Sequence, residues 1–282
     1  MRLATIRTSV DGATSAARLD GDHLVALPFP DLAALLGSGA DWRERAAQVA
    51  GEAIALADAD FAPTVPRPEK IICVGLNYRG HALEAKLDLP SHPVLFGKYW
   101  RTLIGANDEL QLPPNSDEVD WEAELGVVIG APTRYVEPSE ALDAVAGYTI
   151  VNDVSMRDWQ LRTAQFLQGK NFEASTPVGP YLVTPDEVDH AKRLQIRCLV
   201  DDELMQEAYT DDLVFGVAEI ISYISQIITL SPGDLIATGT PAGVGGARSP
   251  AVYLKHGQQL QTVIEGLGEQ NNRCVAGDRS LV

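Results

Sequence analysis

The hydrophobic pattern of this chain consists mainly of short apolar runs separated by turn residues, and these runs predict strands. Each run is rich in Val, Ile and Leu and is bounded by Gly, Pro, Asp or Asn. Two further runs near the C-terminal end alternate like paired strands around a turn at 266–268. The predicted strands are 3–8, 70–74, 119–129, 148–152, 194–200 and 235–238, and a pair within 259–275.

One segment follows a helical period instead. Six apolar residues repeat at helical spacing after an Asp-Asp pair: Val214, Val217, Ile220, Ile221, Ile224 and Ile228. A Ser-Pro-Gly turn at 231–233 ends the pattern. The segment therefore predicts one amphipathic core helix. Shorter helices are expected at 138–146, closed by Gly147, and at 155–165.

The first 60 residues predict a small separate unit with a hairpin turn at 20–21 and alanine-rich helices within 31–57. A segment with three prolines, 61–69, follows, and its stiff, extended character indicates a boundary. We therefore predict a small N-terminal domain over residues 1–65 and a larger, catalytic domain over 66–282.

Composition and charge exclude some partners. The chain has 282 residues, 45% of them hydrophobic and 22% charged, which is ordinary for a globular enzyme. Its net charge is −17 and it contains no run of lysines or arginines, so a nucleic-acid partner is not expected.

The cysteines and the apolar stretches indicate the compartment. Cys73, Cys198 and Cys274 are widely spaced and odd in number, which predicts buried free thiols rather than disulfides or a zinc site. The longest apolar stretch, 213–230, is interrupted by Glu219 and other polar residues, so no membrane span is expected. We predict a cytoplasmic protein without a membrane partner.

Glu122 and Glu124 are the strongest candidates for chemistry. Alternate side chains of a strand share a face, so these two carboxylates lie side by side at the start of a strand that is apolar enough to be buried. Like charges this close need a cation, and a hard ion such as Mg²⁺, Mn²⁺ or Ca²⁺ prefers oxygen ligands. The alternative is an exposed edge strand with two solvated glutamates.

His81 and Glu84 form a second candidate pair. Three residues apart, they share one face if the chain turns helical after Asn77. A carboxylate beside an imidazole fixes its tautomer and raises its basicity, which suits a general base for water. The alternative is an ordinary surface pair at a helix start.

Asp153 and Lys170 extend the candidate site. Asp153 follows the predicted strand 148–152 and is placed to be a third metal ligand, although it also suits a helix cap. Lys170 is the one lysine in an otherwise uncharged run, where it would stabilise developing negative charge. The alternative for Lys170 is a surface lysine with a buried stem.

Two further features favour a small anionic ligand. The glycine-rich loop 239–246 follows a strand but lacks the Gly-Lys-Ser/Thr ending of a nucleotide-binding loop, so it indicates close backbone approach to a small molecule. A plain flexible loop is the alternative. The segment 77–101 is locally basic and carries Arg79, Lys86, His92, Lys98 and Arg101. Solvated lysines and arginines on the surface are the alternative.

Taken together, these stretches resemble the fumarylacetoacetate hydrolase superfamily. The matching motifs are Gly-Leu-Asn-Tyr-Arg-Gly-His-Ala-Leu-Glu at 75–84, Asp-Trp-Glu-Ala-Glu-Leu at 120–125, Asn-Asp-Val-Ser-Met-Arg-Asp-Trp-Gln at 152–160, Gly-Lys-Asn-Phe at 169–172 and Thr-Gly-Thr-Pro-Ala-Gly-Val-Gly at 238–245. They occur in the family's order over roughly the last three-quarters of the chain. The resemblance implies a β-rich α/β fold around a rolled mixed sheet, with a small N-terminal α+β domain, and a homodimer.

The resemblance also implies a role for each matching residue. Glu122, Glu124 and Asp153 match the metal ligands, for Mg²⁺ or Mn²⁺ with Ca²⁺ as a further candidate, and His81 with Glu84 matches a water-activating dyad on a lid. Lys170 matches the active-site lysine. Gln160 matches a substrate-facing glutamine, and Gly239 with Thr240 matches the loop that holds the substrate.

We therefore expect a metal-dependent hydrolase that cleaves a carbon–carbon bond in a 1,3-diketo acid such as an acylpyruvate or fumarylpyruvate. A dianionic substrate would need Lys170 and, as further cations, Arg79 or Lys98. The alternatives are a 2-oxo acid decarboxylase or an isomerase or tautomerase that uses the same metal site, and a non-catalytic binding module. Relatives with a tyrosine between Gln160 and Lys170 differ from this chain, which has Phe166 there.

Overall fold

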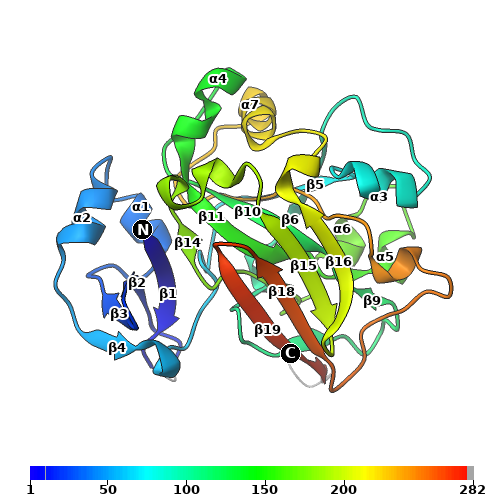
Figure 1. Cartoon of the computed structure of the whole chain (residues 1–282), viewed down its shortest axis with the longest axis horizontal. Helices are drawn as coiled ribbons and strands as arrows, with labels where there is room; N and C mark the ends of the chain where they lie inside the picture. Colours follow the sequence, from blue (N-terminus) through cyan, green and yellow to red (C-terminus); the bar gives the residue numbers. More distant parts are fainter. Residues whose placement is uncertain (10, 278–282) are drawn as a thin grey trace.

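A computed structural model describes residues 1–9 and 11–277, and two large sheets organise it (Figure 1). The first sheet has ten strands in the order β4 (Ala53–Ala55), β3 (His23–Ala26), β2 (Thr14–Asp20), β1 (Arg2–Arg7), β14 (Leu182–Val183), β11 (Val145–Asn152), β10 (Ala123–Ile129), β17 (Leu235–Ala237), β5 (Ile71–Gly75) and β6 (Val94–Lys98). The second has five, in the order β16 (Glu203–Tyr209), β15 (Gln195–Val200), β18 (Gln259–Ile264), β19 (Gly268–Ala276) and β8 (Leu110–Leu112).

The other elements of the described residues are short. Two small strand pairs are β9 (Val119–Asp120) with β12 (Ser155–Met156), and β7 (Leu103–Ile104) with β13 (Thr176–Pro177). The α-helices are α1 (Leu32–Leu36), α2 (Trp42–Gln48), α3 (Arg79–Glu84), α4 (Pro138–Ala141), α5 (Arg157–Gln160), α6 (Leu167–Lys170) and α7 (Val217–Ile227). Single 3₁₀ turns are η1 (Leu56–Asp58), η2 (Trp100–Thr102), η3 (Leu142–Ala144), η4 (Pro185–Glu187), η5 (Asp189–Ala191), η6 (Thr210–Asp212) and η7 (Gly245–Ala247). This is the β-rich α/β class predicted from the sequence.

Strand β10 lies in the middle of the structure and is buried on both faces, as its unbroken apolar run predicted. Its odd-numbered side chains, such as Leu125 and Val127, pack into the core that also contains Ile196 and Leu260 of the second sheet. Val128 points to the opposite face, into a second core under the N-terminal helices. Strand β10 pairs antiparallel with β11 and β17, and β17 pairs parallel with β5, so the sheet is mixed.

The amphipathic helix and the C-terminal hairpin are confirmed. Helix α7 buries Ile220, Ile221 and Ile224, and the Glu219 carboxylate accepts the Gly216 N–H at its start, at 2.7 Å. It packs beside α4 at one end of the molecule (Figure 1). Strands β18 and β19 pair across the predicted glycine turn, with Ile264 opposite Gly268. No helix within the described residues is long and apolar enough to cross a membrane.

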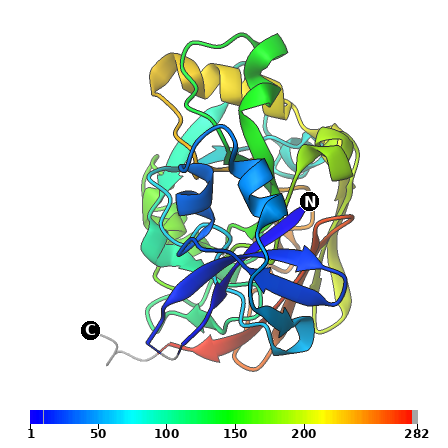
Figure 2. The same ribbon diagram turned by 90° about the vertical axis from the view of Figure 1, so that its left-hand side faces the viewer.

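The N-terminal strands extend the large sheet, because β1 pairs antiparallel with β14 of the following unit. In Figure 2 the molecule is turned so that the N-terminal strands and the helices α1 and α2, in blue, face the viewer. The hairpin at 20–21 is present, with Asp20 opposite His23. Helices occur within 31–57 as predicted, but Ala53–Ala55 is a strand because it pairs with β3. The division into domains at residue 65 stays a prediction.

Two predicted helices are shorter than expected. The α-helix at 138–146 ends at Ala141, and Gly147 lies inside β11 rather than at a helix end. A Cβ atom on Gly147 would lie 2.5 Å from the Val183 carbonyl oxygen, so the strand pairing requires glycine there. The segment 155–165 is helical only at 157–160, because Ser155 and Met156 pair with β9 instead.

Candidate active site

Three buried carboxylates meet where β10 begins and β11 ends. Ala123 lies opposite Asn152 in the sheet, so Glu124 on β10, Glu122 just before it and Asp153 just after β11 are close together. The Asp153 N–H donates to the Glu122 carbonyl oxygen at 2.8 Å and fixes this corner. One carboxylate oxygen from each residue lies within 4.8 Å of the other two.

The two glutamates experience opposite electrostatic surroundings. Burial, together with the negative charges of Asp153 and Glu122, raises the pKa of Glu124 well above its ordinary value. Burial works in the same direction on Glu122, but the positive charges of Lys170 and Arg157 outweigh it and lower its pKa to about 2. Burial and the neighbouring carboxylates therefore disfavour the charged form of Glu124, whereas two cations favour the charged form of Glu122.

Two buried lysines neutralise part of the negative charge of the three carboxylates. Lys170 Nζ donates to Glu122 Oε2 at 2.6 Å and to Asp153 Oδ2 at 2.9 Å. Lys98 Nζ donates to the other Asp153 oxygen at 2.7 Å and also to the Lys170 carbonyl oxygen. Lys98 does not line the cavity. Its ammonium group links the Asp153 side chain to the backbone of Lys170.

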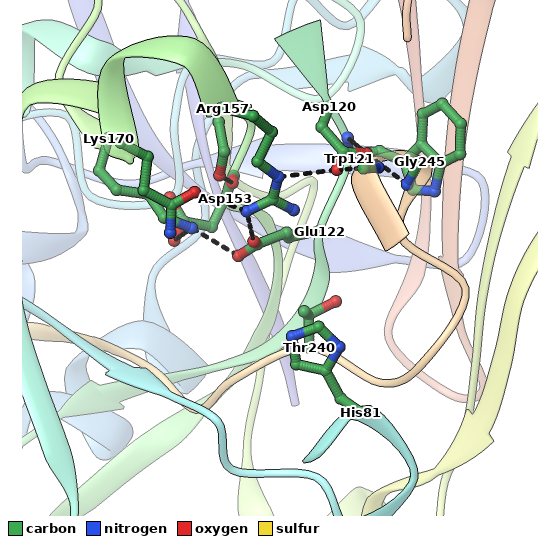
Figure 3. A network of polar contacts seen from close by, with 12 residues as sticks. His81, Asp120, Trp121, Glu122, Asp153, Arg157, Lys170, Thr240 and Gly245 are labelled. Atoms are coloured by element: carbon green, nitrogen blue, oxygen red, sulfur yellow. Dashed lines mark hydrogen bonds and ion pairs between the residues drawn. The ribbon is translucent and has the colours of Figure 1, made fainter. Parts of the chain in front are cut away.

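Arg157 is a third, largely buried cation, and the sequence did not single it out. Its Nη1 lies 2.6 Å from Glu122 Oε1 and its Nε 2.8 Å from Asp120 Oδ2. Its Nη2 is buried and has no hydrogen-bond partner among the described residues. Figure 3 shows Lys170 and Arg157 both pointing at the Glu122 carboxylate. The signal in the sequence was its place four residues after Asp153, at the start of α5.

The His81 and Glu84 side chains meet as their spacing predicted. Both lie on α3, and His81 Nδ1 is 3.3 Å from Glu84 Oε2. The Glu84 carboxylate also accepts the Gly243 N–H, with its two oxygens at 3.0 and 3.1 Å. Figure 3 draws His81 together with Thr240 and Glu122, and all three residues line one cavity.

The substrate-binding candidates lie around the same corner. The Gly239 N–H donates to Glu124 Oε2 at 2.8 Å, so its backbone orients a carboxylate. Thr240 lines the cavity, and its hydroxyl donates to the Ala123 carbonyl oxygen at 2.9 Å. Gln160 also lines the cavity, and its Oε1 accepts from Arg157 Nη1 at 2.8 Å.

A cavity of about 540 Å³ opens over these residues. It is lined by His81, Glu84, Glu122, Glu124, Arg157 and Lys170, among others. The basic segment 77–101 does not form one patch here: Arg79 donates to the Leu213 carbonyl oxygen at 2.8 Å, Arg101 pairs with Glu173 at the surface, and Lys98 is buried. Of that segment's lysines and arginines, Lys86 lines the cavity.

The corner fits a hard divalent cation. Its donors are carboxylate oxygens, which Mg²⁺, Mn²⁺ and Ca²⁺ prefer, and Glu122, Glu124 and Asp153 would hold such an ion between them. All three residues are buried, and one oxygen from each lies within 4.8 Å of the other two, so a single ion would reach all three.

Comparison with known proteins confirms the resemblance. Residues 70–275 match the family described as fumarylacetoacetate (FAA) hydrolase C-terminal. Oxaloacetate tautomerase FAHD2B, mitochondrial, from Bos taurus is 46% identical over 217 residues, 76% of this chain and 69% of the relative.

Two solved structures extend the comparison. The 5-carboxymethyl-2-hydroxymuconate delta-isomerase from Mycobacterium smegmatis superposes with a TM-score of 0.80 at 32% identity, over 98% of this chain and 100% of its own. Fumarylpyruvate hydrolase from Pseudomonas aeruginosa, in complex with Mn²⁺ and pyruvate, has a TM-score of 0.68 at 33% identity, over 74% of this chain and 90% of its own.

Proposed function

Because this chain belongs to the fumarylacetoacetate hydrolase family, we propose that it is a metal-dependent hydrolase that cleaves a carbon–carbon bond in a 1,3-diketo acid. The observation that carries this proposal is the His81–Glu84 pair, which lines the same cavity as Glu122 and Glu124, two of the three carboxylates. An imidazole held by a carboxylate is suited to activating water, and hydrolysis is the reaction that needs water.

The bound ion would supply Lewis acidity and orientation for the carboxylate and 2-oxo oxygens of the substrate. We propose that this ion is Mg²⁺ or Mn²⁺. Ca²⁺ would fit the same donors. The Pseudomonas hydrolase with Mn²⁺ and pyruvate supports the assignment by similarity.

The residues of the chain carry the proton transfers. His81, oriented by Glu84, takes a proton from water, and the water oxygen forms a bond to the distal carbonyl carbon. The bond between that carbon and the neighbouring methylene carbon then breaks. The methylene carbon receives the proton, so the products are a carboxylic acid and pyruvate. Lys170 and Arg157 stabilise the negative charge that develops on the substrate oxygens. Gln160 and Thr240 position the substrate.

A second candidate is keto–enol tautomerisation of oxaloacetate, the reaction named for the Bos taurus relative at 46% identity. Tautomerisation moves a proton between carbon and oxygen and needs no attacking water. His81 or Lys170 would serve as the proton carrier.

Acetylpyruvate and enol-oxaloacetate distinguish the two reactions. The protein is assayed with Mg²⁺ or Mn²⁺ and again with EDTA, and pyruvate is measured directly. We expect acetylpyruvate to yield acetate and pyruvate, with the activity lost in EDTA and reduced by about 10²-fold or more in His81→Ala. Decay of the oxaloacetate enol without release of pyruvate, together with no cleavage of acetylpyruvate, would instead establish the tautomerase.

A small anionic oxo acid is thus the proposed ligand. A cytoplasmic location and a homodimer remain predictions from the sequence and the family resemblance. Size-exclusion chromatography with light scattering tests the dimer.

A further inference from the structure

An aromatic wall begins directly beside the charged corner. The Phe96 ring centroid lies 5.3 Å from Lys170 Nζ, and the Phe166 ring stands edge-on to Phe96, with centroids 5.7 Å apart and an interplanar angle of 81°. Both rings line the cavity and are half-buried. The part of a substrate that extends beyond the atoms held near Lys170 would therefore meet these two rings.

Gly75 at the end of β5 allows this arrangement. A Cβ atom there would lie 3.3 Å from Phe166 Cε2 and 3.8 Å from Phe96 Cε1. The absence of a side chain thus avoids a tight contact with Phe166, whereas the distance to Phe96 is an ordinary contact. Leu76 and Leu161 extend the apolar surface of the same cavity.

The two buried cations that line the cavity are already engaged by carboxylates of the chain. Lys170 and Arg157 already pair with Glu122, and each also pairs with a second carboxylate. Lys86 also lines the cavity, but its side chain is exposed, so water screens its charge. A second carboxylate on the distal end of a substrate would thus face aromatic rings rather than a buried cation, and its desolvation would be uncompensated.

We infer that the acyl end of the substrate is apolar, an alkyl or aryl group packed against Gly75, Phe96 and Phe166, and that acylpyruvates with an acidic acyl group are poor substrates. This inference rests on the proposed hydrolase function. Apolar contact with two rings favours such a group through burial and through ring-to-ring packing.

Benzoylpyruvate, acetylpyruvate and fumarylpyruvate test the inference. With Mn²⁺, we expect kcat/KM for benzoylpyruvate to exceed that for fumarylpyruvate by at least about tenfold, within the range that apolar pocket contacts provide. Phe166→Ala should lower kcat/KM for benzoylpyruvate about tenfold and kcat/KM for acetylpyruvate by a clearly smaller factor, because a methyl group offers the rings far less apolar surface than a phenyl group. Phe29→Ala, in the N-terminal unit, is the matched control.

Binding is measured separately from cleavage, by calorimetry on Mn²⁺-loaded His81→Ala protein with benzoylpyruvate and fumarylpyruvate. Tighter binding of benzoylpyruvate supports the apolar wall. Equal or tighter binding of fumarylpyruvate overturns it, as does a Phe166→Ala variant that loses acetylpyruvate and benzoylpyruvate activity equally. Failure of the wild-type protein to cleave any of the three compounds overturns the hydrolase proposal instead, and the two failures are thereby distinguished.

Discussion

Asp120 and Glu122 bind different nitrogens of the Arg157 guanidinium: Asp120 Oδ2 lies 2.8 Å from Nε, and Glu122 Oε1 lies 2.6 Å from Nη1. The Asp120 oxygens also accept the N–H groups of Gly245 and Gly246, at 2.6 and 2.8 Å. One buried carboxylate thus fixes both the cation of the active site and the loop beside it.

Asp120→Ala is expected to lower the free energy of unfolding by about 3–5 kcal/mol, the loss typical when one partner of a buried ion pair is removed. The substitution leaves Arg157 with a single buried carboxylate partner and two loop N–H groups without acceptors. Urea unfolding of the metal-free protein measures the change. Asp22→Ala, whose side chain is 90% exposed, is the control and should shift stability by less than about 0.5 kcal/mol. Equal losses in the two variants would show that Asp120 does not anchor the site.

Glu124→Gln is expected to have two opposite effects. Burial, together with the negative charges of Asp153 and Glu122, raises the pKa of Glu124, and the neutral amide removes the cost of a buried charge there, so the metal-free protein should melt at a higher temperature. Loss of a ligand charge should weaken Mn²⁺ binding by more than about tenfold, since even outer partners of a metal site contribute that much. Thermal unfolding in EDTA and calorimetric titration with Mn²⁺ give the two values.

The exposed Glu44 provides the control for this substitution. Glu44→Gln should change neither the melting temperature nor the Mn²⁺ affinity appreciably. Unchanged Mn²⁺ affinity in Glu124→Gln would remove Glu124 from the metal site.

Glu84 combines a charge with a structural contact, and two substitutions separate them. Glu84→Gln keeps an oxygen that can accept the Gly243 N–H but removes the charge beside His81. We expect kcat to fall by about 10²-fold or more, with KM little changed, because base catalysis alone is weakened. Glu84→Ala also removes the contact with Gly243 and should raise KM. A Glu84→Gln variant with wild-type kcat would contradict a role for the dyad in activating water.

Local periodicity predicted much of the site. Glu122 and Glu124 were placed on one face by the two-residue period of a strand, and both carboxylates do join Asp153, although β10 itself begins at Ala123. His81 and Glu84 were paired by helical spacing, and α3 brings them to 3.3 Å. Such pairs depend on a few consecutive dihedral angles, which the local sequence largely determines.

The roles of Arg157, Lys98 and Asp120 could not be predicted in the same way. Arg157 contacts a carboxylate 37 positions away in the chain, and Lys98 one 55 positions away, so both contacts depend on how the strands assemble. The strand Ala53–Ala55 was missed for a similar reason. Its alanines favour helix, but pairing with β3 outweighs that preference.

Gly243 lies on the loop whose backbone N–H contacts Glu84 of the His81–Glu84 pair. It has φ +102°, and a Cβ atom there would overlap the Met205 carbonyl oxygen. Gly257 has a similar φ, +89°, but no atom lies within 4 Å of its Cβ position. The two positions therefore share the backbone strain of a left-handed conformation and differ in steric overlap.

Gly243→Ala is expected to reduce stability by about 1–3 kcal/mol more than Gly257→Ala, because overpacking adds to the strain. It should also lower activity, since the Gly243 N–H contacts Glu84 and the loop must move to relieve the overlap. Chemical unfolding of both variants gives the difference, and acetylpyruvate cleavage gives the functional effect. Equal losses of stability would show that the loop adapts freely around position 243, and full activity in Gly243→Ala would show that the dyad does not depend on this contact.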